Sequence, residues 1–229
     1  MKEHQSAAIE LLSGLPAGYL LDAGSGGKAV GAFLKERGFH VFPIDLFEAP
    51  FLKGTFARAD MNEGVPFAAN VFDYVFCSET LQYLDNHALV FREFKRVLKK
   101  DGQICLSMPN VLSANSRFSF FQRGYFPHFK PFRTVDKGKG WDAAVYNPIS
   151  LVEIISLMRK NGFEMKALKA SRIKAANIPL YLILKALYLA GLLFERHAQK
   201  AALLRTLSSR EALAGDHLIM LFAPAPSAV

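Results

Sequence analysis

An acid and several glycines interrupt an apolar run near the start of the 229-residue chain. The segment Asp22–Ala29 reads DAGSGGKA and follows the apolar residues Tyr19 to Leu21. Glycines at a strand-to-helix turn let a ligand approach the backbone, and the helix N-terminus behind them favours a negatively charged group. The pattern therefore predicts a site for a carboxylate or a phosphate. It is not a P-loop, because the upstream glycine and the Ser or Thr after Lys28 are both missing.

Two classes of ligand fit this turn. Gly24, Gly26 and Ala29 match the G-x-G-x-x-A pattern of dinucleotide-binding turns, with Asp45 near the distance expected for an acid that binds a ribose. Asp22, however, stands two residues before the first glycine, where it would attract a positively charged amino group and repel a pyrophosphate. The turn therefore favours a methyl donor that carries an amino group, and a nicotinamide cofactor is the alternative.

A second acid, Asp60, comes after a short predicted third strand, where it is placed to accept a hydrogen bond from an adenine amino group. A helix cap is the alternative role for Asp60. Asp73, at the start of the next apolar run, is interpreted as a structural acid of a strand rather than as a ligand.

The stretch from Tyr19 to Asn110 resembles the class I S-adenosylmethionine-dependent methyltransferases, in particular the group called type 11. The order of motifs is the same: the acid-glycine turn, Asp45 at the end of the second strand, Ala59-Asp60, the Phe72-Asp73 strand, and Arg96–Lys99 before Asp101-Gly102. Within this group, the MetW-like branch and related enzymes of polysaccharide gene clusters are similar at Asp60–Gly64, Ser78–Gln82, Pro109-Asn110, Arg117 and Arg123-Gly124. The resemblance extends more loosely to Phe163.

The resemblance implies an enzyme that binds S-adenosylmethionine and transfers its methyl group. Asp45 would bind the ribose hydroxyls, the turn glycines would approach the methionine portion, and Leu46 and Met61 would pack on adenine. Lys28 stands where the family has a third glycine, so either the backbone shifts by one residue or the lysine pairs with the methionine carboxylate. The residues expected to bind the donor are Asp22, Gly24, Ser25, Gly26, Lys28, Asp45, Leu46, Asp60, Met61 and Ser78.

The atom that receives the methyl group is inferred by excluding the motifs of enzymes that methylate nitrogen or carbon. Residues 77–80 read Cys-Ser-Glu-Thr, unlike the Asn/Asp-Pro-Pro-Tyr of enzymes that methylate amino groups of adenine or glutamine, and the Pro-Cys nucleophile of cytosine-C5 enzymes is absent. An oxygen acceptor is therefore favoured. The candidates for a base that takes its proton are Glu79, Tyr83, Tyr125 and His128, with a structural role as the alternative for the histidine.

The segment 110–147 is expected to form a lid on the acceptor side, because related enzymes place acceptor-binding loops after the fifth strand. It interleaves phenylalanines with basic residues, and from Arg92 to Lys139 the chain has eleven Lys or Arg against three acids. This mixture suits an anionic, partly apolar acceptor, such as a phosphorylated or lipid-linked sugar. Nucleic acid is disfavoured as the acceptor because the rest of the chain is electrically balanced. The alternative without a binding role is a second small core of phenylalanines with solvated basic residues.

Apolar runs alternate with helix-like segments, which predicts a largely parallel sheet covered by helices on both faces. The resemblance implies that this is an α/β fold of the Rossmann-like class I methyltransferase type. We expect a mostly parallel seven-stranded sheet with an antiparallel last strand, in a single domain over 1–229 with a helical insertion over 178–214. Strands are predicted over Tyr19–Leu21, Phe39–Ile44, Val71–Cys77, Gln103–Met108, Phe163–Ala170 and His217–Ala223, helix-like segments over Lys28–Arg37 and His87–Lys99, and a helix start at Asn147 or at Ser150.

Ile178–Phe194 is almost wholly apolar but is shorter than the ~20 residues that a spanning helix needs, and Lys185 lies in its middle. Burial over the sheet is expected, and docking on a membrane surface together with the basic stretch Arg196–Arg210 is the alternative. Met1–Gly18 has no apolar signal region, so a cytoplasmic protein is expected, with peripheral contact to the inner face of the membrane as an option.

The two cysteines, Cys77 and Cys105, lie in apolar runs without metal-ligand spacing, so no metal site is predicted. Two further functions stay open beside an O-methyltransferase that acts on a small molecule, a glycan or a lipid-linked acceptor. One is a non-catalytic partner subunit of the MetW-like kind, and the other is an NAD(P)-dependent oxidoreductase.

Overall fold

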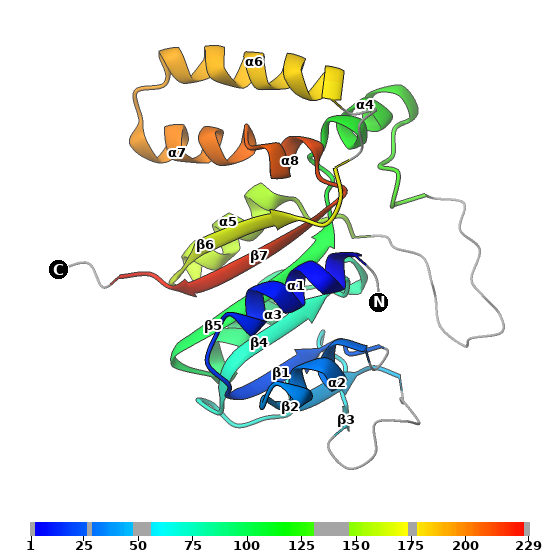
Figure 1. Cartoon of the computed structure of the whole chain (residues 1–229), viewed down its shortest axis with the longest axis vertical. Helices are drawn as coiled ribbons and strands as arrows, with labels where there is room; N and C mark the ends of the chain where they lie inside the picture. Colours follow the sequence, from blue (N-terminus) through cyan, green and yellow to red (C-terminus); the bar gives the residue numbers. More distant parts are fainter. Residues whose placement is uncertain (1–2, 27–28, 48–55, 131–146, 174–177, 227–229) are drawn as a thin grey trace.

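Seven strands form one sheet in the order β3-β2-β1-β4-β5-β7-β6 in the computed structural model, which describes residues 3–26, 29–47, 56–130, 147–173 and 178–226 (Figure 1). β7 runs antiparallel to both of its neighbours, and the other six strands are parallel to one another. The predicted Rossmann-like methyltransferase fold is thereby confirmed. The strands are β1 (Tyr19–Ala23), β2 (His40–Asp45), β3 (Ala57–Arg58), β4 (Phe72–Ser78), β5 (Leu98–Pro109), β6 (Phe163–Ala170) and β7 (His217–Pro224).

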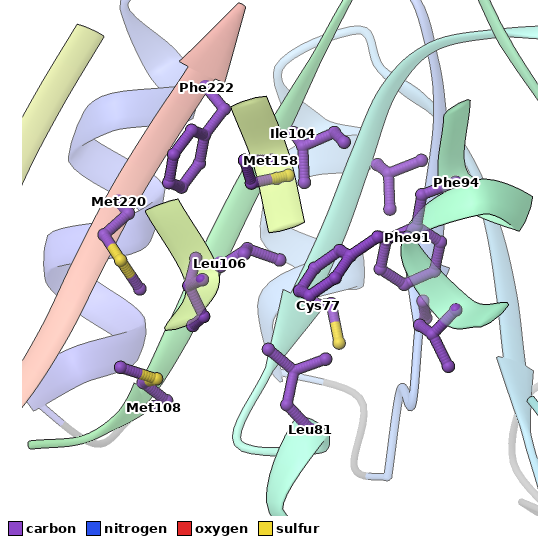
Figure 2. Close-up of a cluster of buried hydrophobic side chains, with 14 of the residues drawn as sticks. Cys77, Leu81, Phe91, Phe94, Ile104, Leu106, Met108, Met158, Met220 and Phe222 are labelled. Atoms are coloured by element: carbon purple, nitrogen blue, oxygen red, sulfur yellow. The ribbon is translucent and has the colours of Figure 1, made fainter. Parts of the chain in front are cut away.

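Helices cover both faces of the sheet (Figure 1). α1 (Glu3–Ser13) and α2 (Ala29–Glu36) pack on one face, and α3 (His87–Val97) and α5 (Leu151–Lys160) pack on the other. Because successive side chains of a strand point to opposite faces, each central strand supplies both cores. In β4, for example, Phe76 packs with the α1 and α2 side, whereas Cys77 packs with the α3 and α5 side. Figure 2 shows the second core, in which Phe91 and Phe94 of α3 lie near Cys77.

Two predicted element boundaries are corrected. Of the two proposed starts for α5, the structure has Ser150, whose side chain accepts a hydrogen bond from the Glu153 backbone N–H. Asn147 instead donates its side-chain N–H to the Leu84 carbonyl, at 2.6 Å. α3 ends at Val97, two residues before the predicted end, because Leu98 already pairs with Phe72 in the sheet.

A helix occupies part of the segment after β5 that is expected to form a lid. α4 (Ala114–Arg123) begins at Ser113, whose side chain accepts from the Ser116 N–H, and ends at Gly124 in the left-handed conformation, at φ 75°. The rest of the predicted lid segment over 131–146 lies outside the described residues. A short 3-10 helix, η1 (Leu81–Tyr83), follows β4.

Three helices, α6 (Ile178–Phe194), α7 (Ala198–Leu207) and α8 (Arg210–Ala214), lie between β6 and β7, where a helical insertion was expected. α8 contacts β6, and α6 packs on α4, α7 and α8 as an outer layer away from the sheet (Figure 1). α6 contains no buried residue, so the expectation that it is buried over the sheet is wrong. No helix in the described part of the chain has the length and hydropathy needed to cross a membrane.

Candidate functional site

The polar residues singled out in the sequence gather at one edge of the sheet. β1, β2, β4 and β5 end at this edge, and β7 begins there, since Pro109 at the end of β5 pairs with His217 at the start of β7. α1 begins at the same edge (Figure 1). In open α/β sheets, ligands bind outside the carboxyl ends of the parallel strands.

The acid-glycine turn follows β1, and two of its glycines are required for different reasons. Gly24 has φ +79°, and an added Cβ would lie 2.1 Å from Thr80 Oγ1, so the turn is packed against the segment after β4. Gly26 has φ +47°, and an added Cβ would meet no atom of the described residues within 4 Å. Gly24 is therefore fixed by packing inside the protein, whereas Gly26 presents bare backbone to open space.

Asp45 ends β2 and faces the same turn. Its Oδ2 accepts a hydrogen bond from the Gly26 N–H at 2.8 Å, and its Oδ1 accepts from the Phe47 N–H at 3.1 Å. These two bonds orient the carboxylate beside the open side of Gly26. Each oxygen keeps a further lone pair that can accept a hydrogen bond from a ligand hydroxyl.

Asp22, the last residue but one of β1, is buried with only 5% of its surface exposed. Its carboxylate approaches the backbone of α2 at Gly31, where an added Cβ would lie 3.2 Å from Oδ2. Burial, with a further contribution from the negative charge of Asp45, raises the pKa of Asp22 to about 7. A buried acid of this kind is stabilised in its charged form when a cation comes near.

Two buried side-chain oxygens at this edge, Ser25 Oγ and Gln82 Oε1, have no hydrogen-bond partner within the described residues. Ser25 belongs to the turn after β1, and Gln82 belongs to η1 after β4. Buried polar atoms without partners are rare in folded proteins because each costs free energy. A polar ligand bound at this edge could supply the hydrogen bonds that these two oxygens lack.

The other predicted donor residues have mixed surroundings. Leu46 is 42% exposed just after β2, whereas Met61 is buried in the larger core. Asp60 accepts a hydrogen bond from the Asn62 N–H at 2.8 Å and so closes the turn after β3, which is the capping kind of role. Ser78 Oγ lies 2.8 Å from Ser107 Oγ. Lys28 lies outside the described residues.

Asp73 has a structural role. Its carboxylate binds Lys99 Nζ at 2.8 Å and accepts a hydrogen bond from the Tyr19 N–H at 2.9 Å. The burial of Asp73 alone would raise its pKa, but the contacts with Lys99 and Tyr19 outweigh burial and lower it. These bonds tie β1 to β4 and β5 at the far edge of the sheet from the turn.

On the acceptor side, Glu79 directly follows β4 in a left-handed conformation, with φ 57°. Such a φ is uncommon for a residue other than glycine. Ser107 Oγ donates to Glu79 Oε1 at 3.2 Å, and His217 Nε2 lies 3.4 Å from Oε2. Burial would raise the pKa of Glu79, but the hydrogen bond and charge of His217 lower it.

The other candidate bases lie near this edge or beside it. His128 Nε2 lies 3.3 Å from Asp216 Oδ1. Tyr83 ends η1, and Tyr125 lies just beyond α4; both are half-buried. Sequence reasoning missed His4, Asp216 and His217, which surround Glu79 and His128. The one available signal was the position of His217 at the start of the antiparallel strand, which must begin where its neighbour β5 ends.

A separate cavity of about 670 Å³ opens beneath α6, and none of its lining residues belongs to the acid-glycine turn. Its walls are apolar and aromatic, with Arg117 of α4 as the charged group. Arg117 Nε donates to the Leu112 carbonyl at 2.7 Å, and the guanidinium lies 5.4 Å from the ring centre of Tyr188 in α6. The lining residues are Val111, Leu112, Arg117, Phe120, Phe121, Phe126, Val152, Tyr188 and Leu207.

Residues 21–106 match the sequence model of a family described as a methyltransferase domain. The ubiquinone biosynthesis O-methyltransferase of Pseudomonas aeruginosa (strain UCBPP-PA14) is 29% identical over 113 residues, which cover 44% of this chain and 49% of that enzyme. The chain thus aligns with about half the length of the curated relatives it matches.

Two solved structures share the fold along nearly the whole chain. An S-adenosylmethionine-dependent methyltransferase from Archaeoglobus fulgidus superposes with a TM-score of 0.60 at 15% identity, covering 96% of this chain and 94% of that one. The 1,6-didemethyltoxoflavin-N1-methyltransferase of Burkholderia thailandensis, solved with 1,6-didemethyltoxoflavin and S-adenosylhomocysteine, gives 0.57 at 13% identity, covering 97% and 79%. At these identities the likeness shows the fold alone.

Proposed function

We propose that the protein is an S-adenosylmethionine-dependent methyltransferase, because residues 21–106 match the sequence model of a methyltransferase domain and the chain has the class I methyltransferase fold. One observation carries the proposal. The open backbone of Gly26 and the oriented carboxylate of Asp45 face each other across the ends of β1 and β2. This pair supplies an acceptor for two vicinal hydroxyls beside bare backbone, which is what a nucleoside ligand requires.

The residues around Gly26 and Asp45 are suited to the amino group, the other polar atoms and the adenine ring of S-adenosylmethionine. Asp22 offers a carboxylate that a positively charged amino group stabilises, and the partnerless oxygens of Ser25 and Gln82 are ready for polar ligand atoms. Leu46 is exposed enough to pack on an adenine ring. S-adenosylmethionine, when bound, supplies a methyl group activated by its sulfonium charge.

The chemistry left to the protein is alignment and removal of one proton. As an acceptor oxygen forms its O–CH3 bond, the S–CH3 bond breaks and the hydroxyl proton passes to a base. Glu79 and His128 are the candidates, because each is held by a partner at the acceptor side of the edge. The acceptor atom is proposed as oxygen on the sequence argument, since residues 77–80 lack the motifs of base and amide methylases.

We place the acceptor among small molecules, glycans or lipid-linked compounds with anionic character. The apolar cavity beside α4 with Arg117 in its wall suits a partly apolar anion. α6, whose Tyr188 lines this cavity, also exposes several leucines, and the bases Arg196, Lys200 and Arg205 before and within α7 are exposed as well. An apolar helix beside bases is typical of peripheral contact with an anionic membrane.

A binding and turnover experiment tests the proposal. S-adenosylmethionine and S-adenosylhomocysteine should raise the melting temperature, whereas NADH should leave it unchanged. A shift with NADH alone would instead favour an oxidoreductase. Donor binding without methyl transfer to any hydroxyl compound in a broad acceptor panel would favour a non-catalytic partner subunit.

A further inference from the structure

Three imidazoles and two carboxylates gather at the acceptor side of the sheet edge. His4 comes from α1, Glu79 follows β4, and His217 opens β7. The rings of His4 and His217 stack with their centres 5.1 Å apart, and His217 Nε2 lies 3.4 Å from Glu79 Oε2. One ligand atom from each of these three side chains lies within 4.8 Å of the other two. Three segments far apart in the sequence thus bring metal-ligating atoms to one point.

The donor set has a defined chemistry. Two imidazole nitrogens and one carboxylate oxygen are ligands that Zn²⁺ and neighbouring divalent transition metals accept. Three protein ligands leave a coordination position open, which is typical of catalytic rather than structural zinc sites. The sequence predicted no metal site, because residues 4, 79 and 217 show no local spacing pattern.

The outer contacts of the cluster match those of known metal sites. A ligating histidine commonly presents its second ring nitrogen to a carboxylate, which fixes the ring and raises its basicity. His217 Nε2 faces Glu79, and its Nδ1 lies 3.9 Å from Asp216 Oδ2. Glu79 is likewise held from behind, by the hydrogen bond from Ser107 Oγ to Oε1. Glu79 is therefore oriented before an ion arrives, and Asp216 lies at ion-pair distance behind His217.

The backbone at Glu79 supports the same reading. Its φ of 57° directly after a strand carries a conformational cost for a residue with a Cβ, and its side chain meets His217 of β7. Strain of this kind persists where the surrounding structure holds it, and such positions cluster at functional sites.

We propose that His4, Glu79 and His217 bind a divalent transition-metal ion, for which Zn²⁺ is the probe. Metal binding by these side chains does not depend on methyl transfer. Its use does rest on the proposed function: an ion held by Glu79 would coordinate the acceptor hydroxyl and lower the pKa of that hydroxyl. Of the two candidate bases, His128 would then take the proton, because Glu79 is a ligand of the ion.

The test is calorimetric titration of the full chain with ZnCl2, after removal of any affinity tag and of bound metal by chelation. We expect one Zn²⁺ per chain. His217→Ala and His4→Ala should weaken binding by more than ~100-fold, and Asp216→Asn, which changes an outer contact, by ~10-fold to ~100-fold. His40→Ala is the matched control, because His40 is exposed at the opposite edge of the sheet and should bind as the parent does.

Glu79→Gln keeps the shape of the side chain and guards against a variant that fails to fold; far-UV circular dichroism checks each protein. Absorption of bound Co²⁺ in the visible range reports the ligands directly and should be lost in Glu79→Gln. Absence of stoichiometric Zn²⁺ binding would overturn the proposal, as would equal affinity in all variants. Loss of binding in His128→Ala with full binding in His4→Ala would also overturn it, by assigning the ion to His128, Asp216 and His217. Because the titration contains no donor, its outcome is independent of methyltransferase activity.

Discussion

Asp45 is the side chain on which the proposed donor site most depends. Its carboxylate is already oriented by two backbone N–H groups, so a ligand hydroxyl gains a charge-assisted hydrogen bond without ordering the acid first. We expect Asp45→Ala to weaken S-adenosylmethionine binding at least ~10-fold, since each such bond contributes about 1.5 kcal/mol or more. Isothermal calorimetry measures the dissociation constant. An unchanged constant would remove Asp45 from the site.

Asp22 makes stability depend on pH. Its pKa is raised to about 7 from an ordinary value of 3.8, so between these values the folded protein holds a proton that the unfolded chain has released. The free energy of unfolding should therefore fall as pH rises through this window, by at most ~4 kcal/mol from this group. Asp22→Asn should flatten the fall.

Urea denaturation at a series of pH values measures the effect of Asp22. Glu36→Gln, which removes an exposed carboxylate from α2, is the control and should keep the slope of the parent. If Asp22→Asn also keeps that slope, Asp22 is charged in the free protein and the raised pKa is refuted.

Individual site residues differed in how far the sequence could reveal them. The turn glycines and Asp45 could be proposed from the sequence because they lie in one local motif at a strand end. His4, Asp216 and His217 were missed, because their proximity to Glu79 depends on how α1 and β7 meet the sheet. For Asp60 the sequence left two roles open, an adenine contact and a cap. Residue types alone could not show the local hydrogen bond that it accepts from the Asn62 N–H.

Among the elements, α4 places the basic side chain of Arg117 in the cavity wall. Arg117 lines the cavity, whereas Arg123 at the end of the same helix is exposed and does not. We expect Arg117→Ala to weaken binding of an anionic aromatic dye such as anilinonaphthalene sulfonate about 5-fold, as loss of a partly screened charge contact of ~1 kcal/mol implies. Fluorescence titration measures it. Arg123→Ala is the control, and an equal loss in both variants would point to general surface charge.

The strands were largely predictable, and the exceptions have physical causes. β6 matches its predicted bounds, since the apolar pattern after the Gly162 helix end is undisturbed. β5 begins five residues earlier than predicted, because Leu98 pairs with Phe72 although the charged residues after it suggest a helix end. α6 was the larger error. Its composition indicates burial against the sheet. α8 contacts β6 instead, and α6 packs on the outer side of α7 and α8.

At the scale of the whole molecule, the exposed face of α6 and the net charge of +8 should act together at a lipid surface. We expect the protein to sediment with phosphatidylglycerol vesicles at low salt, and less at high salt, because screening weakens the contribution of the bases. The double variant Leu187→Glu/Leu193→Glu should abolish binding; both residues are exposed, at 64% and 82%.

Lys35→Glu is the control for charge in this assay. It lowers the net charge by two, as the double variant does, but lies on α2, remote from α6. Binding that is lost equally in both variants would show that total charge, rather than α6, holds the protein to the vesicles.

The two thiols report on global unfolding. Cys77 and Cys105 are almost completely buried in opposite cores. Burial raises the pKa of both, to about 12 for Cys105, so neither forms the reactive thiolate in the folded protein. A thiol reagent such as dithionitrobenzoate should label the native protein only as fast as it opens, and both thiols at once after denaturation. Rapid labelling of one thiol under native conditions would reveal local opening.

The place of β7 in the sheet has a consequence for the protein during its synthesis. β7 is inserted between β5 and β6, and within the described part of the chain β7 is the single strand neighbour of β6. On the ribosome, six of the seven strands emerge before the one that joins β6 to the rest. Until residues 217–224 leave the exit tunnel, the nascent chain carries one open edge on β5 and a β6 strand that is unpaired on both sides, each able to pair with another molecule. We therefore expect ribosome-bound chains halted before residue 217 to recruit chaperones more strongly than chains halted after β7 has emerged.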